Sequence, residues 1–418
     1  MKKIYLLFGL ISIISIQLIA QCNNRYQTNI FTNVDVTTVQ YGSNMNLNNA
    51  NIDLYMDIYQ PQGDLETNRP LVIFAHGGSF SAGSRNSPEI VFMATELAKK
   101  GYVCASISYR LAPSAFSLIA EETTIKVVFM AIQDGKAAIR FFKQDAANAN
   151  TYKINPDQIF MGGTSAGGIL AYNLAYGDTI TKLSTQWQTW VNQVGGIEGN
   201  SGNPGFCSRA NGTFGFAGGV ADTAWINDND VPLYASHSHD DQTVKFGLGR
   251  PLNGFTPVFL FGSGPINIRM DNLNTYNELD DYTGSDHPPF VNSTPILNIT
   301  NDNLTTFLFN ILDCNPSNLK KPNQKDCNTF TVGIAENKLA TTFSAYPNPA
   351  EDFITIDLSE NPTEIVRISV INSVGQLVIS EQTQNRFHQL DLLQLPKGAY
   401  VVHVIGSKNY TNKLIIKK

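Results

Sequence analysis

The sequence predicts an α/β domain, a mostly parallel sheet with helices on both faces, followed by a small C-terminal all-β sandwich. Helical stretches at about 88–100 and 122–147 alternate with apolar runs that end in turn residues, and strand alternating with helix favours a parallel sheet. Beyond residue 343 only short runs of period two remain, without a helix, which is typical of a small antiparallel sandwich. The predicted strands of the first domain are 52–60, 71–76, 102–109, 158–163 and 231–237.

Length and composition set the broad class. The chain has 418 residues, of which 42% are hydrophobic, enough for one large core and a smaller second domain. Its net charge of -6 provides no basic field for phosphates, so nucleic acid is not an expected partner.

The first residues resemble a secretory signal peptide. Lys2 and Lys3 precede an apolar run that ends at Ala20, so we expect residues 1–20 to be removed on export. An uncleaved anchor and a lipidated Cys22 are the alternatives. No later stretch is long and apolar enough to cross a bilayer, so no membrane span is expected in the mature chain.

Export permits disulfides among the five cysteines. Cys104 lies in the buried strand "YVCASISY" and is expected to be a free, inert thiol. Cys314 and Cys327 flank a polar loop and are the expected local pair, although Cys22 or Cys207 could take either partner.

The stretch "FMGGTSAGGI" places Ser165 in a G-x-S-x-G pattern between a predicted strand and a predicted helix. Glycines at 163 and 167 suit a turn that strains the serine backbone and brings strand and helix close together. The alternative is a tight glycine turn with no chemistry. In the functional interpretation, Ser165 is a nucleophile and the N–H of Ala166 faces the oxygen that it attacks.

A second glycine-rich turn supports the functional interpretation. The earlier strand ends in "FAHGGSFSAG", where the N–H groups of Gly78 and Ser79 could face a developing oxyanion together with that of Ala166. Sheets of this kind bind ligands at the carboxyl ends of their strands, where both turns fall.

A serine nucleophile needs a base held by a carboxylate. His76 belongs to the oxyanion turn, and His388 and His403 fall in the C-terminal sandwich. Of the remaining histidines, His287 in "GSDHPPF" is expected to be the general base, while His237 and His239 are expected to serve packing and the wall of the site. In "VPLYASHSHDDQTV" we expect Asp241 to orient His287, with Asp240 as its rival.

These stretches resemble the α/β-hydrolase esterases that carry an HGG oxyanion motif, most closely the secreted acetyl and feruloyl esterases acting on plant polysaccharides. The resemblance covers about residues 45–315 and implies a catalytic set of Ser165, Asp241 and His287 with Gly78, Ser79 and Ala166 as oxyanion hole. Ser238 and Lys245 depart from the family, which often has glycine and proline at these positions.

The C-terminal segment is similar to the sorting domain of the type IX secretion system of Bacteroidota, through "AYPNPAEDFITIDL", "INSVGQLVIS", "LPKGAYVVHV" and "KLIIKK". The chain becomes polar and poor in periodicity from about Lys320, which predicts a linker at 320–342 between a catalytic domain at 21–319 and a sorting domain at 343–418. The resemblance makes the secretion machinery a partner. A substrate-binding β-module is the alternative.

The sequence therefore predicts a secreted or cell-surface serine esterase that needs no cofactor and no metal. Acetyl or feruloyl esters, possibly polysaccharide-linked, are the expected substrates. A lipase or polyester hydrolase is the alternative within the fold. An inactive hydrolase-like binding module is the alternative from another class.

The Asn- and Gly-rich segment 195–215 has two interpretations, a functional loop and a mobile linker. Trp187, Trp190, Trp225 and Phe80 could line a pocket that accepts a ring, or could belong to the core.

Overall fold

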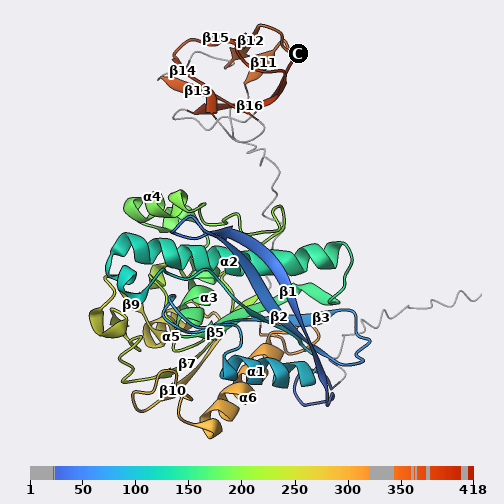
Figure 1. The fold of residues 1–418 in the computed structure, drawn as a ribbon, viewed down its shortest axis with the longest axis vertical. Helices are drawn as coiled ribbons and strands as arrows, with labels where there is room; N and C mark the ends of the chain where they lie inside the picture. Colours follow the sequence, from blue (N-terminus) through green and yellow to red (C-terminus); the bar gives the residue numbers. More distant parts are fainter. Residues whose placement is uncertain are drawn as a thin grey trace, which may run out of the picture. The chain divides into compact units, whose positions relative to one another are not determined.

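The computed structural model divides the chain into two compact units, Met1–Cys327 and Asn328–Lys418 (Figure 1). The structure describes residues 22, 24–319, 343–358, 362, 365–372, 377–405 and 413–418. The expected signal peptide at 1–20 and linker at 320–342 lie outside the described residues. Among the described helices, none has the length and hydropathy needed to cross a membrane.

An eight-stranded sheet organises the first unit, in the order β1-β2-β4-β3-β5-β6-β7-β10. Strands β1 and β2 pair antiparallel, β2 pairs antiparallel with β4, and every pairing from β4 to β10 is parallel. The predicted α/β class with a mostly parallel sheet is therefore confirmed. The strands are β1 (Val34–Met45), β2 (Asn51–Pro61), β3 (Arg69–Ala75), β4 (Val103–Ile107), β5 (Ile154–Thr164), β6 (Gly212–Phe216), β7 (Leu233–Ser238) and β10 (Asn277–Tyr282).

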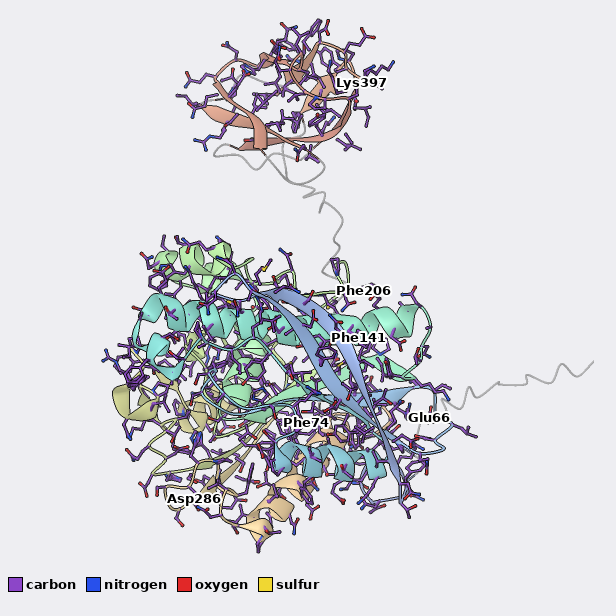
Figure 2. All side chains as sticks on the ribbon, in the orientation of Figure 1. Glu66, Phe74, Phe141, Phe206, Asp286 and Lys397 are labelled. Carbon is purple, nitrogen blue, oxygen red and sulfur yellow. A yellow bond between two sulfur atoms is a disulfide. The ribbon has the colours of Figure 1, made fainter. Side chains whose placement is uncertain are left out.

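Helices cover both faces of this sheet, because alternate residues of its central strands point to opposite sides. On β3, Ile73 belongs to one hydrophobic cluster and Phe74 to the other. Phe74 is labelled in Figure 2. The first cluster contains residues of α2, α3 and α5, and the second contains residues of α1 and α6. The helices are α1 (Pro88–Lys99), α2 (Glu121–Ala147), α3 (Ala166–Tyr176), α4 (Thr185–Gln193), α5 (Ser263–Asn272) and α6 (Thr294–Asn310).

Segment 195–215 is fixed against α2. The hydroxyl of Ser201 donates to Asp134 at 2.5 Å, and the buried Arg110 guanidinium lies 2.9 Å from the same carboxylate. Lys136 of α2 pairs with Glu198 at 2.5 Å. The segment then runs into β6, a central strand. The interpretation of this segment as a mobile linker is therefore wrong, because the buried hydrogen bond of Ser201 and the ion pair of Glu198 fix the segment to α2.

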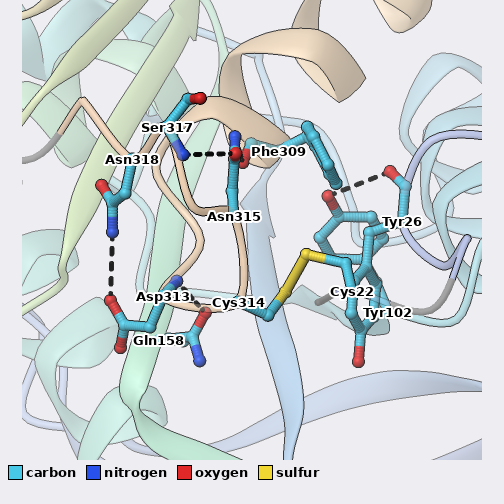
Figure 3. The surroundings of a disulfide bond; sticks show 10 residues. All are labelled: Cys22, Tyr26, Tyr102, Gln158, Phe309, Asp313, Cys314, Asn315, Ser317 and Asn318. Carbon is cyan, nitrogen blue, oxygen red and sulfur yellow. Dashed lines mark hydrogen bonds between the residues drawn. A yellow bond between two sulfur atoms is a disulfide. The ribbon is translucent and has the colours of Figure 1, made fainter. Parts of the chain in front are cut away.

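A disulfide joins the two ends of the first unit. Cys22 bonds to Cys314 across 292 residues of sequence, and the expected pairing of Cys314 with Cys327 is wrong (Figure 3). Cys314 follows α6, whose core cluster includes Cys22 and Tyr102, so packing and not sequence proximity decides the pair. The bond also argues against a lipid on the Cys22 sulfur. Cys207 is disulfide-bonded too, whereas Cys104 is free and buried, as expected.

The second unit contains two antiparallel sheets around its own apolar cluster. One has the order β11-β12-β15 and the other the order β14-β13-β16-β17. Its core includes Ile354, Ile368, Leu390 and Val402, and no helix occurs among its described residues. The strands are β11 (Ser344–Tyr346), β12 (Phe353–Asp357), β13 (Val366–Asn372), β14 (Leu377–Thr383), β15 (Phe387–Asp391), β16 (Gly398–Ile405) and β17 (Lys413–Lys417). The predicted C-terminal all-β unit is confirmed.

Candidate active site

Ser165 occupies a strained turn between β5 and α3. Its backbone has φ 53° and ψ -114°, a left-handed region that costs a residue with a side chain about 1–3 kcal/mol. Its N–H donates to the carbonyl oxygen of Phe216 at 2.7 Å, which ties the turn to the end of β6. Surrounding structure thus holds the serine in a conformation that the isolated chain would avoid.

The glycines around Ser165 are required by the neighbouring strand β3. A Cβ added at Gly163 or at Gly167 would lie 2.0 Å from the carbonyl oxygen of Ala75, the last residue of β3. Backbone atoms cannot yield as a flexible side chain can. The two glycines therefore allow the end of β3 to approach the serine turn, as the spacing predicted.

Three side chains from distant parts of the chain meet beside this turn. The Oγ of Ser165 lies 2.6 Å from Nε2 of His287, and Nδ1 of His287 lies 2.6 Å from Oδ2 of Asp241. Asp241 follows β7 and His287 follows β10, so both occupy loops at the carboxyl ends of parallel strands. Asp240, the rival carboxylate, is exposed, while Asp241 is buried. The arrangement lets His287 accept a proton from the serine while the carboxylate faces its other nitrogen.

Donors surround the carboxylate of Asp241 on both oxygens. Oδ1 accepts from the N–H groups of Thr243 at 2.8 Å and Val244 at 3.1 Å. Burial alone would raise the pKa of Asp241, but hydrogen bonding with His237 and His287 outweighs it and lowers the pKa from 3.8 to about 2. Asp241 is thus ionised at neutral pH, so its carboxylate can orient His287 through Nδ1.

The two other histidines after β7 differ from each other. His237 is completely buried, and its Nε2 lies 3.3 Å from Oδ2 of Asp241. His239 is half-exposed, stacks on Phe246 at 4.3 Å and pairs with Asp281 at 2.8 Å. Of these two histidines, only His237 therefore contacts Asp241. Its position in the sequence did not reveal this contact.

The loop that carries His287 is held by Ser238, at the end of β7. The hydroxyl of Ser238 is buried and donates to the carbonyl oxygen of Asp286 at 2.7 Å. Asp286 immediately precedes His287. Ser238 thus supplies a hydrogen bond to the histidine loop, a contact that sequence analysis missed.

The turn after β3, which was predicted to carry the oxyanion donors, has successive residues with positive φ. Gly78 has φ +119° and Ser79 has φ 54°, and a Cβ at Gly78 would lie 2.2 Å from the carbonyl oxygen of Ala82. Within the described part of the chain, the N–H groups of Gly78, Ser79 and Ala166 donate to no protein acceptor. These three groups are therefore available to an oxygen atom of a bound molecule.

Tyr109 contacts His76 at the start of this turn, and nothing in the sequence pattern indicated it. Its hydroxyl donates to the carbonyl oxygen of His76 at 2.7 Å, and its ring stacks on the imidazole of His76 at 4.3 Å. Burial lowers the pKa of His76. A neutral ring can still donate from Nδ1 to the carbonyl oxygen of Gly77, 2.6 Å away. His76 is thus a structural part of the turn.

A mostly apolar cavity opens beside Ser165. It encloses about 730 Å³ of space free of atoms, part of it open to solvent. Phe80 and Trp187 belong to its wall, whereas Trp225 is in the core and donates its indole N–H to the carbonyl oxygen of Lys182. Trp190 packs against the same core. Two of the four aromatic residues considered in the sequence thus face the cavity.

The described residues offer no site for a bound metal. Among them, no group of three or more His, Cys, Asp or Glu side chains is arranged to hold an ion.

Two family models match separate parts of the chain. Residues 56–196 match the family BD-FAE, and residues 344–417 match the secretion system C-terminal sorting domain. The first match contains the turn after β3 and the Ser165 turn. The second covers all the described strands of the second unit.

Curated relatives are similar over short regions. A human protein, arylacetamide deacetylase-like 2, is 32% identical over 122 residues, 29% of this chain and 27% of its own length. The para-nitrobenzyl esterase of Bacillus subtilis (strain 168) is 26% identical over 117 residues, 28% of this chain and 23% of its own length. The neuroligin-like protein glit-1 of Caenorhabditis elegans is 30% identical over 116 residues, 27% of this chain and 14% of its own length. The chain thus spans about a quarter or less of these relatives.

Among solved structures, the native esterase 2 of Thermogutta terrifontis has a similar fold. The match covers 67% of this chain and 94% of that chain, with 20% sequence identity and a TM-score of 0.48.

Proposed function

We propose that this chain, which carries a BD-FAE esterase domain followed by a secretion-system sorting domain, is a serine carboxylesterase. The observation that carries the proposal is the position of His287, within 2.6 Å of both Ser165 Oγ and Asp241 Oδ2. The names of two relatives, an esterase and a deacetylase-like protein, support acyl transfer as the reaction class.

In the proposed reaction, Nε2 of His287 takes the proton of Ser165 while Oγ forms a bond to the ester carbonyl carbon. The carbonyl becomes an oxyanion, which the N–H groups of Gly78, Ser79 and Ala166 stabilise. The oxyanion then collapses, the bond to the alcohol oxygen breaks, and His287 gives its proton to the departing alcohol. Water repeats these steps against the acyl-serine and releases the acid, returning the proton to Ser165.

Asp241 has an electrostatic role in this reaction. It stays ionised because its pKa is about 2, and it keeps Nδ1 of His287 protonated so that Nε2 can act as a base. The positive charge on His287 during the reaction is stabilised at a contact of 2.6 Å. The carboxylate itself takes no proton.

The finer substrate proposal is acetyl or feruloyl esters, possibly linked to plant polysaccharides. It rests on the resemblance to acetyl and feruloyl esterases, with the BD-FAE match at 56–196 in support. A hydroxylated acyl ring would need a polar partner where it is buried.

A lipase or polyester hydrolase is the second candidate, and the cavity favours it. Three polar side chains in the wall already use their hydrogen-bonding groups on the protein backbone. Thr124 donates to Leu118 at 2.8 Å, and Thr256 donates to Pro251 at 3.3 Å. Asn173 donates to Ile169 and Gly219 and accepts from Ala221. Ser79 and Thr243 also line the wall, which is otherwise mostly apolar and suits alkyl or unsubstituted aryl groups.

A hydrolysis panel tests the proposed reaction and separates its substrate classes. It compares acetylated xylan, methyl ferulate, short and long p-nitrophenyl esters and an aromatic polyester film, each with the wild-type chain and Ser165→Ala. We expect the wild-type chain to hydrolyse at least one class, and Ser165→Ala to lose about 10⁶-fold in kcat. Absence of wild-type activity on every ester would instead favour an inactive hydrolase-like binding module.

The sorting domain at 344–417 indicates secretion or attachment to the cell surface. In our proposal the secretion machinery recognises this domain, and the domain takes no part in ester hydrolysis. Deleting residues 343–418 should therefore abolish export from the native host while the purified catalytic unit keeps its kcat/KM.

A further inference from the structure

His237, the fifth residue of β7, makes polar contacts through both ring nitrogens although it is completely buried. Nδ1 lies 2.8 Å from the hydroxyl oxygen of Ser263, the first residue of α5. Nε2 lies 2.9 Å from the carbonyl oxygen of Val244 and 3.3 Å from Oδ2 of Asp241. A buried ring with these contacts does more than fill space.

The surroundings of Nε2 determine where the ring carries its hydrogen. A backbone carbonyl and an ionised carboxylate can only accept, so Nε2 must be a donor. In the tautomer with its hydrogen on Nε2, Nδ1 can accept from the hydroxyl of Ser263. That hydrogen is shared between Val244, the shorter contact, and Asp241, the longer one.

We propose that His237 is a positioning residue that fixes the carboxylate of Asp241 for His287, an inference that rests on the proposed function. His237 contacts Oδ2 directly, the same oxygen that faces Nδ1 of His287. It also acts on Oδ1 through Val244, whose carbonyl accepts from His237 and whose N–H donates to Oδ1. This imidazole thus contacts Oδ2 directly and is linked to Oδ1 through the two backbone groups of one residue, Val244.

His237 touches neither the serine nor the cavity, so it is distinct from the reacting groups. The competing explanation is packing alone, since the ring meets Phe246 edge-on at 5.6 Å. The two explanations differ in what they require at position 237. Packing needs a ring of similar size, whereas positioning needs an N–H at the place of Nε2.

Two substitutions separate these requirements. His237→Phe keeps a ring but removes the donor, and His237→Gln supplies an amide N–H near the position of Nε2. We expect His237→Phe to lower kcat/KM about tenfold, the lower end for a hydrogen bond to a charged group, because the contact at 3.3 Å is long. KM should change little, and His237→Gln should recover most of the loss.

The pH profile of kcat/KM reports the site in a way that general destabilisation does not. Without His237, Oδ2 serves His287 alone and stabilises its protonated form more strongly. We therefore expect the acidic limb in His237→Phe to move to higher pH and to return in His237→Gln. If the acidic limb of the kcat/KM profile in His237→Phe stayed at the wild-type pH or moved to lower pH, the proposal would be overturned.

A second measurement needs no enzyme activity. His237 and His287 are the titratable groups that contact Asp241, and the pKa of Asp241 follows from the fall in unfolding free energy as the pH is lowered from 5 to 2. His237→Phe should raise that pKa, so that its stability falls less over this range, while His237→Gln should resemble wild type. Equal falls in all three proteins would overturn the positioning role. If the pKa of Asp241 rose in His237→Phe but the wild-type chain had no esterase activity, the positioning role would be retained and the proposed function refuted.

Discussion

Replacing Gly167 with alanine tests whether the oxyanion turn and the serine turn depend on one close backbone approach. A Cβ at position 167 would lie 2.0 Å from the carbonyl oxygen of Ala75, 2.5 Å from its carbonyl carbon and 2.9 Å from the carbonyl oxygen of His76. All three atoms belong to backbone, and His76 leads directly into the turn at Gly78. Relief must therefore come from moving the end of β3 away from α3.

The size of that movement follows from the distances. Ordinary contacts of a Cβ begin at about 3.4 Å, and even tight ones need about 3.0 Å, so Ala75 must shift by at least about 1 Å. A displacement of about 1 Å in a catalytic arrangement costs about 100-fold in rate. Added volume in a closely packed site also costs about 1–3 kcal/mol of unfolding free energy.

The assay compares kcat/KM for p-nitrophenyl acetate and the urea unfolding midpoint in wild type, Gly167→Ala and Gly247→Ala. Gly247 is the matched control because nothing lies within 4 Å of an added Cβ there. We expect the control to match wild type, and Gly167→Ala to lose about 100-fold in kcat/KM. If Gly167→Ala kept wild-type kcat/KM and midpoint, the claim that β3 and the serine turn form one rigid site would be refuted.

Four further predictions concern Asp241 and the cysteines. Asp241→Asn should lower kcat about 10⁴-fold in the ester assay, because the amide no longer fixes the tautomer of His287. The free energy of unfolding should depend on the same carboxylate. The pKa of Asp241 is 3.8 in the unfolded chain and about 2 in the folded chain. The carboxylate therefore contributes about 2 kcal/mol of stability above pH 4, and this contribution is lost as the pH falls to 2. Urea unfolding should show this loss in wild type and not in Asp241→Asn. Replacing Cys22 and Cys314 with serine opens a loop closed across 292 residues. Chain entropy sets a ceiling of about 6 kcal/mol, and we expect a loss of 2–5 kcal/mol in non-reducing urea unfolding, with unchanged stability contradicting it. Burial raises the pKa of the Cys104 thiol, so a thiol reagent should label Cys104 only after unfolding, and rapid labelling of the folded chain would contradict its burial.

Sequence alone determined the features that depend on neighbouring residues. The glycines around Ser165 and the glycines after His76 are local requirements of tight turns, so their spacing predicted both turns before any packing was known. Alternation of strand and helix predicted the parallel sheet, and parallel strands bring their carboxyl ends to one edge. That rule is why Asp241 and His287 could be named from loops far apart in the chain.

Tertiary structure decided whatever depends on which distant segments pack together. The partner of Cys314 is Cys22 because α6 packs where the first described residues lie, although Cys327 is nearer in sequence. The contacts of His237 with Asp241 and of Tyr109 with His76 are likewise invisible in sequence spacing. Such contacts follow from the burial of side chains between layers of the fold, and burial is a property of the whole unit, not of any one segment.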